Sequence, residues 1–331
     1  MQSKKAQMSS SFNYIFAIII GGIIFMFFVG FAYKFMGFGE SIGAAGLVTS
    51  MNDEFAAFSA SDSAEKTLSF NKETSFRVYE AKVISEGQSK QIDHIVYAPF
   101  LIEGRDIFIS TKALELPYRV GNVFYVDDGS TLYILVYDSV SDEVVGDLVS
   151  SYNSIPTNLP TYSVDVKDIN TNVQDLVGAS NGYDNVRFIF FTKYDTVLST
   201  IQSNFGAYEI LYVTSSENDY SSGYVVFPDG SQVAYLTYPL LIGAMVSGDA
   251  YMYSYNYDLV MEKVSRVSNV YLEKSKLLAT RLPNCEYTLI KSALGSYMSI
   301  LGNDGYSSYV TNIENIEEEN KKLGGDCPEV Y

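Results

Sequence analysis

Hydrophobic residues are concentrated near the N-terminus in one long run. The 20 residues from Tyr14 to Tyr33 include no charged side chain. A helix of that length rises about 30 Å, which matches the hydrocarbon core of a lipid bilayer. The pattern therefore predicts a transmembrane helix over residues 12–36 and a lipid bilayer as a partner.

The charges on either side of this run predict its orientation. Lys4 and Lys5 precede it, and the first acidic residue, Glu40, follows it. Because basic residues stay on the cytoplasmic side, residues 1–11 are expected to form a cytoplasmic leader, and the bulk of the chain is expected to be extracytoplasmic. Ala17 and Gly21 are small residues four positions apart. They would allow close helix packing and hence self-association, or contact with envelope partners, through the transmembrane helix.

The residues that follow the membrane segment predict a helical stalk with a hinge over residues 37–72. Glycines at 37, 39 and 43 favour a break directly after the membrane. From residue 40 to 58, apolar residues recur at helical spacing. They are Ala44, Ala45, Leu47, Val48, Met51, Phe55 and Phe58.

Residues 73–140 are expected to form a β-rich subdomain with a mostly antiparallel sheet. Apolar residues alternate with polar ones near Phe76, and short apolar runs follow at 92–97 and 107–109. The segments 118–126 and 131–137 flank Asp127-Asp128-Gly129-Ser130. Since glycine admits the positive φ of a tight turn, this pattern predicts a β-hairpin.

Residues 141–247 alternate between helical and strand patterns, which predicts an α/β subdomain. A second hairpin is expected across Pro228-Asp229-Gly230, and residues 170–184 are expected to be a surface excursion. A ligand site in such a layer lies beyond the carboxyl ends of the strands. Here that position is near Thr192 and Thr214-Ser215-Ser216.

Residues 248–331 carry apolar residues at helical spacing and predict a C-terminal helical region. The expected fold class is therefore mixed α+β. Its parts are an N-terminal transmembrane helix and, outside the membrane, a β-rich segment, an α/β layer and C-terminal helices.

Composition narrows the classes of partner. The chain has 39 acidic and 22 basic residues, a net charge of −17, and 28 tyrosines but no tryptophan. Such a charge repels phosphate backbones and disfavours nucleic-acid binding. Tyrosine joins an apolar ring to a polar hydroxyl, so an adhesive, tyrosine-rich outer surface is expected, although a compositional bias explains the count equally well.

Few residues point to catalysis, and no catalytic, cofactor-binding or metal site is predicted. Cys285 and Cys327 form a disulfide or remain two thiols; an extracytoplasmic location favours the disulfide. The single histidine, His94, is interpreted as structural or exposed. With one histidine and two cysteines the sequence lacks the ligands of a typical zinc site, and a Ser-His-Asp triad would have to use His94. Asp127-Asp128 and 303–305 are interpreted as turns.

The N-terminal leader resembles a known type of signal sequence. Lys4-Lys5-Ala6-Gln7, followed by a polar stretch and then the apolar run, resembles an archaeal type IV prepilin (class III) signal. The resemblance implies cleavage between Ala6 and Gln7 that leaves the helix attached. Ser11 stands where many bacterial pilins carry a glutamate. Two stretches, 6–16 and 97–126, also look similar to uncharacterised single-pass membrane proteins of small-genome archaea, for which no activity is known.

The leading hypothesis is a non-enzymatic, membrane-anchored structural or interaction protein of the cell envelope, which the leader resemblance extends to a pilin-like subunit. An anchored monomeric domain that binds a ligand or partner is the first alternative, with a pocket expected near residues 192–216. An anchored hydrolase that uses two carboxylates is the second alternative.

Overall fold

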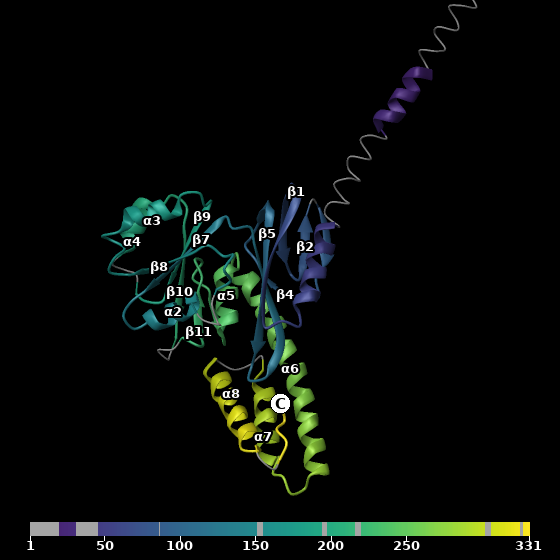
Figure 1. Cartoon of the computed structure of the whole chain (residues 1–331), viewed down its shortest axis with the longest axis vertical. Coiled ribbons are helices and arrows are strands. Elements are labelled where there is room, and N and C mark those ends of the chain that lie inside the picture. Colours follow the sequence, from purple (N-terminus) through teal and green to yellow (C-terminus); the bar gives the residue numbers. More distant parts are fainter. Residues whose placement is uncertain are drawn as a thin grey trace, which may run out of the picture.

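A computed structural model of the chain shows a mixed α+β fold with two six-stranded sheets (Figure 1). The residues that the structure describes are 20–30, 46–85, 87–150, 155–193, 197–215, 220–301, 306–324 and 327–331. The two sheets lie side by side, and three helices extend away from them toward the C-terminus.

The first sheet is antiparallel except at one edge and has the order β3-β2-β1-β5-β6-β4. Only β4 and β6 are parallel. Its strands are β1 (Ser63–Tyr79), β2 (Lys82–Ser85), β3 (Gln88–Gln91), β4 (Ile95–Tyr97), β5 (Ile102–Glu115) and β6 (Arg119–Asp127). A helix over residues 46–58 covers one face with Leu47, Val48, Met51 and Phe55, which are all buried.

The second sheet has the order β12-β11-β10-β9-β7-β8. Its strands are β7 (Thr131–Tyr137), β8 (Thr161–Asp165), β9 (Asn185–Phe190), β10 (Glu209–Thr214), β11 (Gly223–Val226) and β12 (Gln232–Tyr235). Strands β8, β7, β9 and β10 are parallel, and β11 and β12 add the expected antiparallel hairpin.

Helices cover both faces of this second sheet, as parallel strands require. Helices α3 (Val173–Ser180) and α4 (Leu198–Asn204) pack on one face through Leu176 and Ile201. On the other face, α2 (Asp142–Ser150) and α5 (Tyr238–Val246) share a core with the first sheet. The direction of winding reverses at β7, because β8 lies on one side of it and β9 on the other.

The hairpin predicted for residues 118–137 is wrong. Strand β6 pairs with β5 and β4, whereas β7 pairs with β8 and β9 in the other sheet. Asp127-Asp128-Gly129-Ser130 therefore connects two sheets. Both strands are buried over nearly their whole length, so each lies inside its sheet and pairs on both sides instead of forming a half-exposed hairpin.

This connection also moves the predicted subdomain boundary. The β-rich subdomain was expected at 73–140, but β7 belongs to the α/β sheet. The first half of β1 precedes residue 73 and belongs to the first sheet. The helical stalk expected over 37–72 is wrong beyond residue 58, because residues 63–72 belong to β1. Residues 63–69 pair with β5, and within 63–72 only Ala64, Leu68 and Phe70 are even half-buried, so the apolar alternation of the strand is weak there.

Three smaller elements were not expected from the pattern. Helix α3 occupies the segment interpreted as a surface excursion. Strand β8 is polar because it is the edge of its sheet, with only Val164 buried. Helix α5 is apolar all round, and all its residues from Leu240 to Val246 are buried, so it shows no helical stripe.

The C-terminal region is helical, as predicted. Helix α6 (Ala250–Arg281) begins between the two sheets and then extends beyond them (Figure 1). Helices α7 (Thr288–Ile300) and α8 (Tyr306–Lys321) pack with each other, and α7 packs on α6. Asp249 caps α6 by accepting a hydrogen bond from the Met252 backbone nitrogen at 2.7 Å.

Of the predicted transmembrane segment, the structure describes only residues 20–30. They form a helix in which every side chain is exposed, and nothing lies within 4 Å of a Cβ placed on Gly21. Ala6, Gln7 and Ala17 lie outside the described residues. Among the described residues, no helix has both the length and the hydropathy to cross a bilayer.

Many of the tyrosines lie in the core and not on the tyrosine-rich outer surface that was one expectation from their number. Seven of the largest fully buried side chains are tyrosines, namely Tyr97, Tyr125, Tyr133, Tyr235, Tyr253, Tyr287 and Tyr297. Tyr97 stacks on both Tyr125 and Tyr253, with ring centres 6.3 and 5.6 Å away. Their hydroxyls mostly bond to backbone carbonyls, for example that of Tyr125 to Pro239 at 2.7 Å. Tyrosine thus fills the space between the sheets.

Candidate functional site

The site expected at the carboxyl ends of the parallel strands is occupied by the protein's own hydrogen bonds. Thr192 donates its hydroxyl proton to Asp138 at 2.6 Å. Ser215 donates to the Ser222 carbonyl at 2.7 Å. Neither the cavity at the end of β1 nor the one beside α6 includes Thr192, Thr214 or Ser215 in its lining. Ser216 lies outside the described residues.

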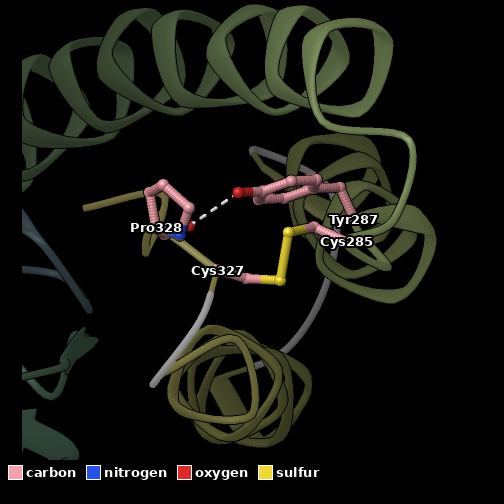
Figure 2. The surroundings of a disulfide bond; sticks show 4 residues. All are labelled: Cys285, Tyr287, Cys327 and Pro328. Atoms are coloured by element: carbon pink, nitrogen blue, oxygen red, sulfur yellow. Dashed lines mark hydrogen bonds between the residues drawn. A yellow bond between two sulfur atoms is a disulfide. The ribbon is translucent and has the colours of Figure 1, made fainter.

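Cys285 and Cys327 form a disulfide, with Cα atoms 5.7 Å apart (Figure 2). It ties the C-terminal tail to the start of α7. Beside it, the Tyr287 hydroxyl donates to the Pro328 carbonyl at 2.9 Å. Neither sulfur is a free thiol, so this pair supplies no nucleophile.

A group of exposed aromatic residues, absent from the sequence-based expectations, gathers at the end of β1. The aromatic patch consists of Tyr79, Phe100 and Tyr251 together with Arg77 and Leu101. Tyr79 and Tyr251 stack with ring centres 5.8 Å apart. The Arg77 guanidinium lies 4.7 Å from the centre of the Phe100 ring, a cation–π contact. Four of these side chains are among the large hydrophobic ones that stay exposed, with Phe100 at 54% and Tyr251 at 53%.

The alternation of side chains along β1 explains why two residues of this strand, Arg77 and Tyr79, reach the surface of the patch. Phe76 and Val78 point into the core, so Arg77 and Tyr79 point outward. Alternation of this kind was visible in the sequence. It did not show that residues from two other segments would meet these side chains.

The other half of the patch depends on a close approach between two chain segments. The Gly248 backbone nitrogen donates to the Ala98 carbonyl at 3.1 Å, and the buried Asn256 amide donates to the Val96 carbonyl at 2.7 Å. These bonds hold the segment that carries Phe100 and Leu101 against the start of α6. Tyr251, in the first turn of that helix, is thereby brought to the patch.

The turn after Tyr79 has an unusual backbone. Glu80 and Ala81 have φ values of 48° and 54°, the left-handed region that non-glycine residues rarely adopt. The Glu80 carboxylate accepts a hydrogen bond from the Tyr251 hydroxyl at 2.7 Å. That bond raises the pKa of Tyr251 and ties the strained turn to the aromatic stack.

The patch borders a cavity of about 390 Å³. Arg77, Tyr79, Phe100, Leu101, Ile84 and Met252 contribute to its lining. A cavity of this size accommodates one or two large side chains of a partner. Apolar rings with an arginine and a polar rim are the composition of the energetically dominant part of a protein interface.

Comparisons of the chain with protein-family models, with curated proteins and with solved structures find no match in any of the three.

Proposed function

We propose that this chain is a non-enzymatic interaction protein of the cell envelope, anchored in the membrane by the helix at residues 12–36. Its extracytoplasmic body binds a partner protein through the aromatic patch. The carrying observation is the contrast between a core that fully buries seven tyrosines and one surface where Tyr79, Phe100 and Tyr251 stay exposed beside a cavity.

Three features support the membrane anchor and the extracytoplasmic placement of the body. The disulfide between Cys285 and Cys327 is a bond that persists in oxidising compartments. The described part of the apolar run, residues 20–30, is a helix with all side chains exposed, as a segment surrounded by lipid would be. The charge distribution of the sequence orients the body outward.

Site-specific photo-cross-linking on the full chain in its native membrane tests the patch. A photoreactive residue at position 79 or 100 is expected to give the same protein adduct. Tyr162, on β8 in the other sheet, is the matched control, because Tyr79 and Tyr162 are both 38% exposed. Replacing Tyr251 with alanine should weaken the adduct about thirtyfold, the loss typical of a central interface residue. Equal labelling at 162, or adducts that ignore Tyr251→Ala, would contradict the proposal.

The resemblance of the leader to a prepilin signal has a separate test. Intact mass and N-terminal sequencing of the membrane-extracted protein are expected to show a chain that begins at Gln7. A chain that begins at Met1 or Gln2 would remove prepilin-type processing and leave an ordinary signal anchor with the same patch.

A further inference from the structure

A second cavity, of about 380 Å³, lies between α6, the segment before β4 and the β3 edge of the first sheet. It shares no lining residue with the cavity at the aromatic patch. Its apolar wall includes Ile92, Ile95 and Leu259, and its polar wall includes Asp93, His94 and Lys263.

Of the three polar side chains, Asp93 and Lys263 are exposed at the cavity and His94 is half-buried. Among the described residues, none of them makes a hydrogen bond or an ion pair with the protein. The other charged pair in the lining is already satisfied, since Arg266 and Glu262 form an ion pair along α6. Asp93, His94 and Lys263 thus keep polar atoms available to a ligand in the cavity.

The imidazole of His94 packs beside two phenyl rings that also contact each other. The ring centres of Phe55 and Phe124 lie 5.5 and 5.2 Å from its own. Burial lowers the pKa of His94; Lys263 lowers it further, and Asp93 acts in the opposite direction. A neutral imidazole can both donate and accept a hydrogen bond.

Lys263 reaches the cavity across a glycine. A Cβ on Gly121 of β6 would overlap the Lys263 ammonium nitrogen, so the missing side chain leaves the space that this ammonium occupies. Burial lowers the pKa of Lys263, and no carboxylate opposes that effect. An anionic group next to the ammonium would remove this cost of burial.

The charges that line the cavity balance. Lys263 and Arg266 are cationic, Asp93 and Glu262 are anionic, and the two unpaired members, Lys263 and Asp93, have opposite signs. A ligand with a net negative charge would gain from Lys263 and be repelled by Asp93. A ligand that carries both charges gains from each.

We propose that this cavity binds a small zwitterion of the α-amino acid class. Lys263 and His94 hold its carboxylate, Asp93 holds its ammonium group, and the wall of Ile92, Ile95 and Leu259 contacts its side chain. This site is separate from the aromatic patch and does not rest on the partner proposed there.

Calorimetric titration of the full chain in detergent with the standard amino acids tests the site, with leucine as the first probe. For leucine we expect the deaminated analogue, 4-methylpentanoate, and the decarboxylated analogue, 3-methylbutylamine, to bind at least about tenfold more weakly, because each lacks one charged contact. No binding by any standard amino acid at millimolar concentration, or equal binding by the carboxylate analogue, would overturn the proposal.

Variants assign the contacts. Lys263→Gln is expected to weaken both leucine and 4-methylpentanoate about tenfold. Asp93→Asn should weaken leucine and leave 4-methylpentanoate unchanged. Lys276→Gln is the control, because Lys276 lies on the same helix and pairs with Glu273. Leucine should also slow acetylation of Lys263 in the wild-type chain, a readout independent of variant folding. Unchanged affinity in Lys263→Gln, or no protection of Lys263, would overturn the assignment.

Discussion

A Cβ atom on Gly248 would lie 2.5 Å from the backbone nitrogen of Phe100. Because the obstructing atom is backbone, it cannot move aside as the tip of a flexible side chain would. Gly248 is thus the residue that lets the Phe100 segment contact the start of α6, and with it half of the aromatic patch.

Gly248→Ala is expected to lower the free energy of unfolding by about 1–3 kcal/mol, since the two segments must separate. Urea unfolding measures the change. The matched control is Gly146→Ala in the exposed part of α2, where no atom lies within 4 Å of the new Cβ. That variant should be more stable by about 1 kcal/mol, because alanine favours a helix. Equal effects at both positions would show that the close approach at Phe100 is not required.

Tyr97→Phe should leave stability unchanged or raise it by up to about 1 kcal/mol. Tyr97 is fully buried, and no described residue bonds to its hydroxyl, so the variant removes a buried polar group without breaking a bond. Tyr125→Phe is the comparison in the same core. It removes the bond to the Pro239 carbonyl and should cost about 1–2 kcal/mol. If urea unfolding shows that Tyr97→Phe lowers the free energy of unfolding more than Tyr125→Phe does, this expectation is wrong.

Asp127 gives the fold a pH dependence. Burial raises its pKa to about 6, although hydrogen bonds from Gly129 and Tyr133 act the other way. The folded protein therefore holds this proton more tightly than the unfolded chain. The resulting stabilisation is complete below pH about 4 and is lost as the pH rises through 6.

The loss amounts to roughly 2–3 kcal/mol, and Asp127→Asn should abolish it. Urea unfolding at pH 4 and pH 7 measures the difference between wild type and variant. Asp229→Asn, at an exposed aspartate in a similar Asp-Gly-Ser turn, serves as the control and should keep the wild-type slope. If Asp127→Asn also keeps that slope, Asp127 is not the titrating group.

The disulfide should contribute about 4 kcal/mol to stability, because its 42-residue separation constrains the unfolded chain. The double variant Cys285→Ala, Cys327→Ala should lose this amount in urea unfolding. Wild-type protein under reducing conditions should behave as the variant does. A loss below about 1 kcal/mol would indicate that packing of Tyr331 against Tyr118 and Tyr271 holds the tail instead.

The sequence predicted elements whose signal is local. The amphipathic helix at residues 46–58, the hairpin of β11 and β12 and the C-terminal helices all showed their own period or turn residues. The element α5 was hidden because total burial removes periodicity, and β8 was hidden because an edge strand needs little apolar surface. The assignment of β6 and β7 to different sheets depends on long-range pairing, which no short stretch of sequence encodes.

The aromatic patch was beyond prediction for the same reason. Its residues come from three segments, around Arg77, Phe100 and Tyr251, and only the fold brings them together. Composition gave no guide to the patch, because it does not show which tyrosines are buried and which stay exposed. Lys263 and Asp93 are similarly ordinary in the sequence and become notable only as unpaired charges beside one cavity.

The direct passage from β6 to β7 limits how the molecule can be divided. Only Asp128, Gly129 and Ser130 separate two strands that belong to different sheets, and the space between those sheets is one continuous core. A fragment that ended at this turn would expose the rings of Tyr125 or Tyr133 to water. Force applied by a partner at the aromatic patch would pass from the first sheet into the second without a flexible linker to absorb it. Evolution can therefore exchange neither sheet alone as a module.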